Sequence, residues 1–208
     1  MEPKRQIWLC LFRGLNVFGR GTISMFDLER CCRTAFSESG LSLLFLDYYG
    51  ATGNVAILAS GVPADDIRKV LFTAIPTPCA LVAPEVVEQV RHAFNAWPAP
   101  ADIPGFRWTP GVSLLCEGTP ATGDLRERDL GVFKRITPTL VLLFRQERIT
   151  ERGTLHSDRS GGWAAVSHRT GTRLGGSWTA RSFDVLEKLL SQAHWKLASD
   201  DRRDPGAS

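Results

Sequence analysis

Two short polar segments of the sequence combine residue types that can bind an anion. The first follows an apolar run and contains Arg13, Asn16 and several glycines. The second contains Thr52, Gly53 and Asn54. A guanidinium and an amide can donate hydrogen bonds to a carboxylate, or to the negative charge that develops on an enolate. Both segments are therefore candidate ligand-binding loops.

Each of these loops also has a structural interpretation. Glycine and asparagine adopt the positive φ of tight turns, so the second loop is equally typical of an ordinary hairpin turn. Arg13 and Asn16 can satisfy loop carbonyls or pair with a carboxylate. The first loop lacks both the Gly-Lys-Ser/Thr of a phosphate-binding loop and the last glycine of the dinucleotide fingerprint. The sequence leaves ligand binding and a purely structural role open.

Four side chains are candidates for proton transfer: Asp47, Tyr49, His156 and His168. An imidazole titrates near neutral pH, which suits a general acid or base. If the segments ending at His156 and His168 lie on paired strands, both imidazoles face one cavity; a solvent-exposed pair is the alternative. Arg181 joins Arg13 as a candidate for stabilising an oxyanion.

The sequence contains no spaced cluster of metal ligands. Its four histidines are scattered, and its five cysteines show no C-x-x-C spacing. The cysteines lie mostly in apolar segments, which predicts buried thiols in a reducing cytoplasm. Cys31 and Ser177 remain candidate nucleophiles. We therefore expect no metal and no cofactor.

The composition indicates a globular protein and predicts neither a nucleic-acid nor a membrane partner; the partner expected from the candidate loops is a small-molecule ligand. The 208 residues are 43% hydrophobic, which is enough for a sizeable core. The net charge is only +3, with basic and acidic residues interspersed, so nucleic acid is a disfavoured partner. No apolar run approaches the roughly 18 residues of a membrane span. We expect a cytoplasmic protein; the sequence does not define its oligomeric state.

The first half of the sequence predicts the order β-α-β-β-α-β. Ser24 is a typical helix N-cap and Gly40 a typical stop, while Gly53 and Asn54 suit a hairpin turn. The expected elements are a strand over 7–12, a helix over 24–38, strands over 43–49 and 55–59, a helix after Pro63 and a strand over 79–83. This order is that of a ferredoxin-like fold.

The second half repeats this order approximately. It is expected to contain a helix over 84–97, a strand over 112–116, a charged helix over 124–135, strands over 139–144 and 163–168, and a helix over 179–197. We therefore predict an α+β protein with two tandem ferredoxin-like lobes packed in one body. The predicted parts are a first lobe with a connecting helix (1–97), a Pro/Gly-rich linker (98–111), a second lobe (112–198) and a disordered tail (199–208).

Three stretches resemble a bacterial family catalogued as domain-of-unknown-function family 1697. The family's R-G-I-N-V-G-G is similar to Arg13 to Gly19, and its P-M-x-x-L helix start is similar to Ser24 to Leu28. Its T-Y-x-Q-S-G-N-V-V-F is similar to Tyr48 to Ile57. Its T-A-R-N-W-R-T-V-x-K-L is similar to Thr179 to Leu189. The resemblance spans almost the whole chain.

The resemblance implies two ferredoxin-like lobes and a shared site. That site would be marked by Arg13, Asn16, Gly53, Asn54 and Arg181. The family has no assigned activity, so the resemblance implies no catalytic role for any residue.

The departures from the family pattern make this chain more apolar. Ala51 stands where the family has Gln, Phe18 where it has Gly, and 182–184 are Ser-Phe-Asp where it has Asn-Trp-Arg. Fewer amide donors and more apolar surface predict a specialised, largely apolar ligand.

These observations favour a cofactor-independent enzyme of isomerase or cyclase type. It would act on an apolar organic acid, keto or acyl compound in specialised biosynthesis. Arg13 or Arg181 would hold oxyanion charge, Asn16 or Asn54 would be a second donor, and one of the four candidate bases would move the proton. The alternative is a non-catalytic binding or regulatory module, including one for single-stranded nucleic acid. The near-balanced charge disfavours that alternative.

Overall fold

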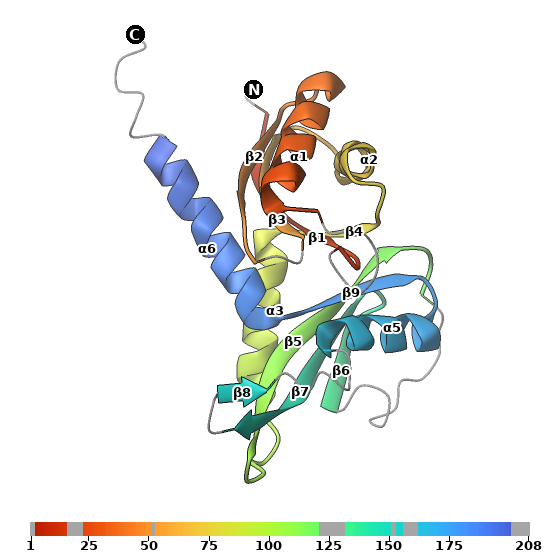
Figure 1. Ribbon diagram of the computed structural model, residues 1–208, viewed down its shortest axis with the longest axis vertical. Helices are drawn as coiled ribbons and strands as arrows, with labels where there is room; N and C mark the ends of the chain where they lie inside the picture. The colour runs from red at the N-terminus through yellow and green to blue at the C-terminus, as the bar shows by residue number, and fades with distance from the viewer. Residues whose placement is uncertain are drawn as a thin grey trace. The chain divides into compact units, whose positions relative to one another are not determined.

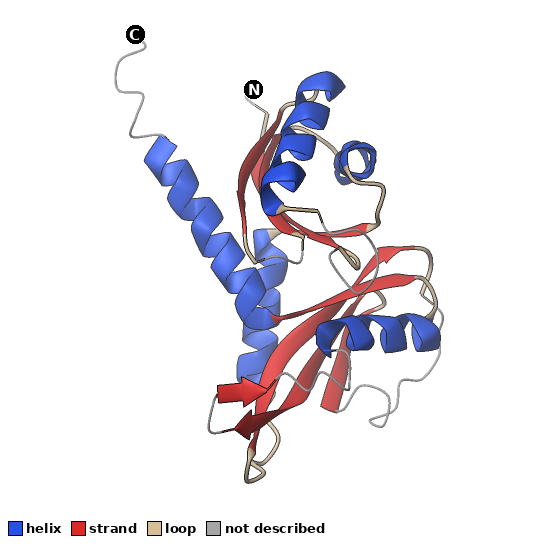
Figure 2. Cartoon of the chain, viewed as in Figure 1, coloured by secondary structure: helices blue, strands red, loops and turns tan. Residues whose placement is uncertain are grey.

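The computed structural model describes residues 3–15, 23–50, 53–120, 132–150, 153–155 and 162–200. The chain divides into two compact units (Figure 1). Unit 1 comprises Met1–Glu85 with Val185–Ser208, and unit 2 comprises Val86–Asp184. The strands form two separate sheets, one in each unit (Figure 2).

Unit 1 contains a four-stranded sheet in the order β2-β3-β1-β4, with every neighbouring pair antiparallel. Its elements are β1 (Arg5–Phe12), α1 (Met25–Ser39), β2 (Leu43–Tyr48), β3 (Asn54–Ser60), α2 (Ala64–Ala74), β4 (Cys79–Val82) and most of α6 (Phe183–Asp200). This is the ferredoxin-like arrangement, so the fold predicted for the first half is confirmed.

The helices α1 and α2 pack on one face of this sheet (Figure 1). α1 begins where predicted because Ser24 Oγ accepts a hydrogen bond from Asp27 N at 3.0 Å. It ends at Gly40, whose φ of 67° is left-handed. The core between helices and sheet is apolar and includes Phe12, Leu28, Phe36, Val55, Ile57, Ile67 and Leu71.

Unit 2 repeats the strand order of unit 1. Its elements are α3 (Pro84–Ala96), β5 (Phe106–Glu117), β6 (Val132–Thr137), β7 (Leu140–Thr150), β8 (Gly153–Leu155), α5 (Gly162–Leu174) and β9 (Ser177–Ser182). The order β6-β7-β5-β9 corresponds to β2-β3-β1-β4, and β8 pairs with β7. The prediction of two ferredoxin-like lobes is therefore confirmed.

Helices cover both faces of the sheet in unit 2. α5 packs on one face, where Val166 and Leu174 join Val141, Leu143 and Trp178 in the core. On the opposite face, α3 places the ring of Phe94 with its centroid 5.4 Å from that of Phe144.

Three elements predicted for the second half are wrong. The segment 163–168 is not a strand but part of α5, whose buried Val166, Thr170 and Leu174 recur every four residues. The end of the predicted helix 124–135 lies in the strand β6; residues 121–131 lie outside the described part. The last helix begins at Phe183 rather than Thr179, because 177–182 pair with β5 as strand β9.

The observed boundaries also differ from those drawn on the sequence. β5 begins at Phe106, inside the predicted linker 98–111. α3 groups mostly with unit 2 rather than with the first lobe, and α6 groups with unit 1 rather than with the second. Residues 199–200 belong to α6, while 201–208 lie outside the described residues.

Candidate functional site

The loop after β1 and the loop between β2 and β3 lie side by side at one end of the sheet in unit 1. Phe12 N donates a hydrogen bond to Gly53 O at 3.0 Å. Gly53 has a φ of +72°, and a Cβ there would lie 2.6 Å from Cδ2 of Leu15. Glycine is therefore required at this position by both its backbone and its neighbour. We call Arg13–Leu15, Tyr49 and Gly53–Asn54 the loop end.

Arg13 is held in the loop end through its backbone. Its N–H donates to Pro78 O at 2.8 Å, and its carbonyl oxygen accepts from Thr77 Oγ1 at 3.2 Å. Arg13 as a whole is half-buried. These contacts fix the backbone of Arg13 at the end of β1.

The amide of Asn54 contributes to the hairpin itself. Asn54 is buried, and its side-chain Nδ2 donates a hydrogen bond to the backbone oxygen of Tyr49 at 3.0 Å. The backbone oxygen of Asn54 accepts a hydrogen bond from Tyr49 N at 3.0 Å. Asp47 contacts its neighbour in the same hairpin, because its Oδ1 accepts from Tyr48 N at 2.8 Å. The structural role of a hairpin turn therefore accounts for these three hydrogen bonds.

A second cation of the loop end is Lys188 of α6, whose ammonium group lies over the Tyr49 ring. Its Nζ is 5.8 Å from the centroid of the Tyr49 ring, within the range of a cation–π interaction. Sequence reasoning missed Lys188 as a site residue because it is far along the chain. The available signal was its place in the third stretch that resembles the family.

Arg181 and His168 belong to unit 2. Arg181 Nη1 donates to Thr179 Oγ1 at 2.9 Å and to Ala180 O at 2.8 Å. Burial lowers the pKa of Arg181 to about 10, so it is still a cation at neutral pH.

His168 is exposed on α5, so the condition of paired strands is not met and His168 is solvent-exposed, as in the alternative. The predicted site residues Asn16, Thr52 and His156 lie outside the described residues.

A group of charged side chains around the buried Glu147 of unit 2 was not predicted from the sequence. Glu147 is only 1% exposed; its Oε1 accepts from Arg145 Nη1 at 3.3 Å and its Oε2 from Arg107 Nη2 at 3.2 Å. Burial lowers the pKa of Arg145, and the neighbouring Glu147 opposes that shift. We call Arg107, Thr109, Arg145 and Glu147 the Arg145 cluster.

Two surface hollows in unit 1 lie away from the predicted site residues. One has a volume of 390 Å³ and is lined by residues of α1 and β2, with the Arg33 guanidinium 5.2 Å from the centroid of the Phe45 ring. The other has a volume of 290 Å³ and lies between β1 and the start of α2. Neither is lined by a residue of the loop end.

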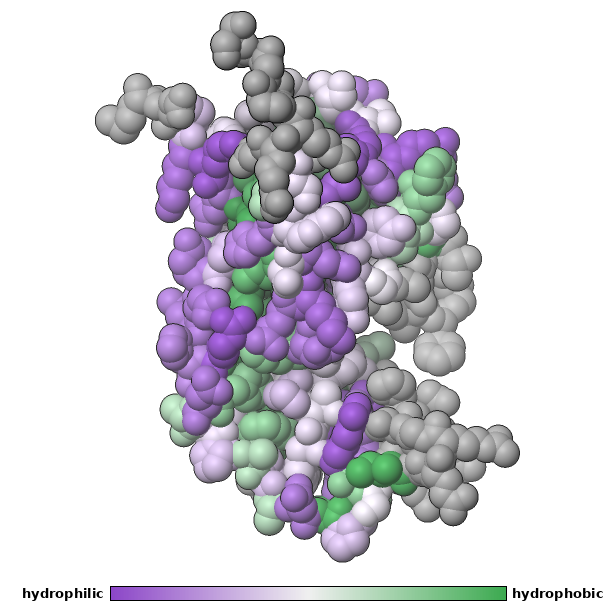
Figure 3. Space-filling model, turned by 90° about the vertical axis from the view of Figure 1, so that its left-hand side faces the viewer, coloured by the Kyte–Doolittle hydropathy of each residue, from purple (hydrophilic) through white to green (hydrophobic). Residues whose placement is uncertain are grey.

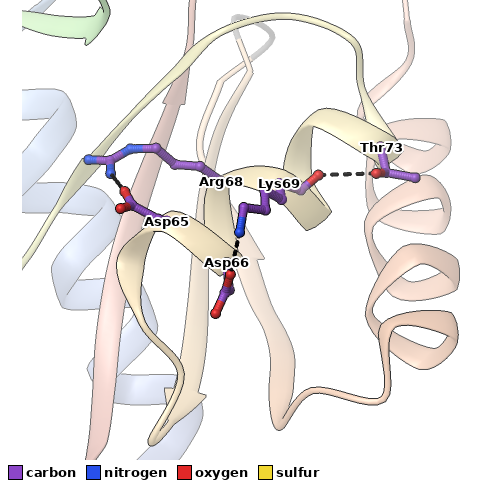
Figure 4. A network of polar contacts seen from close by, with 5 residues as sticks. All are labelled: Asp65, Asp66, Arg68, Lys69 and Thr73. Atoms are coloured by element: carbon purple, nitrogen blue, oxygen red, sulfur yellow. Dashed lines mark hydrogen bonds and ion pairs between the residues drawn. The ribbon is translucent and has the colours of Figure 1, made fainter.

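The exposed charges of α2 form pairs within the helix. Arg68 pairs with Asp65 at 2.7 Å and Lys69 with Asp66 at 2.8 Å (Figure 4). Pairs of this kind on a solvated helix face contribute little free energy. The charges of α2 therefore provide no evidence for a binding site.

The face drawn in Figure 3, on the side of α6 and β2, carries hydrophilic and hydrophobic residues together.

Three cysteine thiols lie in the core of unit 1. Burial raises the pKa of Cys32 and of Cys79 to about 12, and it raises that of Cys10 well above its ordinary value. None of the five cysteines, all within the described residues, forms a disulfide. The three core thiols are protonated at neutral pH and are poor nucleophiles there.

Stability is expected to fall as the pH rises above about 9. The unfolded chain ionises its thiols near pH 8.5, whereas the native core keeps Cys32 and Cys79 protonated up to about pH 12. Each thiol therefore removes up to about 1.4 kcal/mol per pH unit from the free energy of unfolding in this window. Urea unfolding at pH 8 and 10 measures the slope. Cys79→Ala should show a smaller slope, and equal slopes would contradict the expectation.

The described part of the chain contains no group of three or more His, Cys, Asp or Glu side chains placed to hold a metal ion. Within the same residues, no helix combines the length and apolar character that crossing a membrane requires.

The strand orders of the two sheets define the class of this protein as an α+β protein with two ferredoxin-like lobes. No family model and no curated protein matches the chain. Its structure is similar to that of the conserved bacterial protein SP0830 from Streptococcus pneumoniae, with a TM-score of 0.53. The match covers 91% of this chain and 99% of the other at 14% sequence identity, so the likeness shows the fold alone.

Proposed function

We propose that this chain is a divergent member of the family it resembles and a cofactor-independent enzyme of isomerase or cyclase type. Its substrate is an apolar organic acid, keto or acyl compound, bound at the loop end of unit 1. The observation that carries the proposal is the packing of Leu15 against Gly53, which brings two polar loops together.

The charges around the loop end support an anionic substrate. Arg13 and Lys188 are both cations of unit 1, and α1 begins at the end of β1 that carries Arg13. The start of a helix favours negative charge because its first N–H groups lack partners in the helix. A carboxylate or an enolate is stabilised in such surroundings.

The proposed reaction is a proton transfer within one substrate. The Asp47 carboxylate, or Tyr49 in its phenolate form, takes a proton from the carbon next to a carbonyl, and Arg13 stabilises the enolate that forms. Returning the proton to another atom of the same substrate completes an isomerisation, so the step is redox-neutral and needs no co-reactant. Asn54 holds the hairpin, and Arg181 and His168 are not part of this proposal because they belong to unit 2.

We place this activity in the cytoplasm, in specialised biosynthesis. Five cysteines without a disulfide support a reducing compartment. The apolar residues that replace family amides support a ligand with a large apolar part.

Arg13→Ala is expected to weaken substrate binding by about tenfold or more, because a hydrogen bond to a charged group contributes about 1.5–3 kcal/mol. The probe is phenylpyruvate, which has a carboxylate, a ketone that can enolise and an apolar ring. Titration calorimetry measures its affinity, and ultraviolet absorbance measures its keto–enol interconversion. Tyr49→Phe should lower the rate more than the affinity if the phenol moves the proton.

The matched control is Arg30→Ala, which removes an exposed arginine of α1 paired only with Asp27 in the described contacts. It should bind phenylpyruvate as the wild type does. Equal affinity of Arg13→Ala and wild type would overturn the loop-end site. Tight binding of random oligonucleotides that falls steeply with salt would instead support the binding-module alternative.

A further inference from the structure

Two buried polar atoms of unit 2 have no hydrogen-bond partner within the described residues. They are Nη2 of Arg145 and Oγ1 of Thr109. Arg145 and Thr109 are directly opposed on β7 and β5, so both side chains leave the same face of the sheet. A buried polar group without a partner costs about 1–3 kcal/mol. Two such atoms on directly opposed residues are the observation from which a ligand is inferred.

The start of α5 lies against this pair. A Cβ on Gly162, the first residue of the 13-residue helix, would lie 3.8 Å from Arg145 Nη1. The next residue, Trp163, places its ring centroid 5.6 Å from Cζ of Arg145. The site therefore combines a helix start, which favours negative charge, with an aromatic surface.

The charges of the Arg145 cluster leave it positive. Among the described contacts, Arg107 and Arg145 both donate to the carboxylate of Glu147, one to each oxygen. The Arg145 side chain is only 8% exposed, so its charge is poorly solvated. Arg169 adds a further positive charge near Arg145. An anion would therefore be stabilised at this place.

We propose that unit 2 binds a carboxylate at this place. One oxygen accepts a hydrogen bond from Arg145 Nη2 and the other from Thr109 Oγ1, while the organic part of the ligand lies against Trp163. A carboxylate fits better than a phosphate because two donors serve two oxygens. A phosphate has additional oxygens that these two donors would not serve. This site is independent of the loop end, which belongs to unit 1.

The test uses benzoate, its neutral analogue benzamide and inorganic phosphate, each titrated into the full-length chain at pH 7. Thr109→Val removes the hydroxyl while keeping the side-chain shape. Because that hydroxyl has no hydrogen-bond partner within the described residues, Thr109→Val should be at least as stable as the wild type when both are measured without ligand. We expect it to bind benzoate about tenfold more weakly, the usual effect of losing a hydrogen bond to a charged group.

Two further results are expected if the site is real. Benzamide does not bind, and Thr172→Val on the exposed face of α5 binds benzoate as the wild type does. A benzoate affinity that Arg13→Ala lowers and Thr109→Val leaves unchanged would instead place benzoate at the loop end of unit 1, which separates this site from the proposed function. Absence of benzoate binding, unchanged affinity in Thr109→Val, or preference for phosphate would each overturn the carboxylate site.

Discussion

Gly111→Ala is expected to destabilise unit 2 by about 2 to 3 kcal/mol. A Cβ at Gly111 would overlap ring carbons Cη2 and Cζ3 of Trp163 and would lie 2.7 Å from Arg181 O. β5 is hydrogen-bonded to β7 on one side and to β9 on the other, so neither the strand nor the carbonyl can move aside easily. Urea unfolding of wild type and variant measures the loss.

A double-mutant cycle with Trp163→Leu tests the cause of this loss. If the clash with the indole is responsible, Gly111→Ala should cost much less in the Trp163→Leu background than in the wild type. Additive effects of the two substitutions would contradict the packing explanation. They would then indicate that the backbone of β5, rather than the ring, resists the added methyl group.

Glu147→Ala is expected to cost about 3–5 kcal/mol, the usual effect of removing one partner of a buried ion pair. Glu147 is 1% exposed and the Arg145 side chain 8%, so the substitution leaves a buried guanidinium without its carboxylate. Glu147→Gln should cost less, because its amide oxygen can still accept one hydrogen bond. Chemical unfolding of the three proteins at neutral pH gives the order of stability.

Two comparisons identify the source of the Glu147 effect. Arg107→Met should lose at most about 1 kcal/mol, since the Arg107 side chain is 54% exposed and screened by water. The double substitution Arg145→Met with Glu147→Leu should be more stable than Glu147→Ala alone, because it removes both buried charges. A double variant as unstable as Glu147→Ala would show that lost packing, rather than the unpaired cation, is responsible.

The fold of unit 1 could be predicted because its local signals agree. Ser24 and Gly40 mark the ends of α1, and Gly53 with Asn54 forms the expected hairpin turn. The strands of unit 1 are apolar runs of ordinary length, so their residues alone identify them.

The second half was harder to predict because two of its elements have misleading compositions. The segment 163–168 is apolar and short, and Gly171 disfavours a helix, yet packing on the sheet makes it part of α5. The segment 132–135 has the charges of an exposed helix. It is a strand at the edge of its sheet, where one side faces water and charged side chains are tolerated.

The candidate sites were predictable to different degrees. Arg13 and Gly53 could be found because their loops contain unusual combinations of residues. The Arg145 cluster could not, because Arg145 and Glu147 look like ordinary charges at the end of a strand. Their burial depends on the start of α5, which the sequence pattern predicted as a strand. Long-range packing, rather than local pattern, creates that site.

The assignment of α6 to unit 1 has a consequence for how the chain folds as it is synthesised. Unit 2 is one continuous stretch, Val86–Asp184, whereas unit 1 is made of two stretches on either side of it. Every strand of both sheets leaves the ribosome before Val185 does. Unit 2 can therefore reach its native contacts while unit 1 still lacks a helix, and a chain cut short before Val185 has both sheets but an unfinished first lobe.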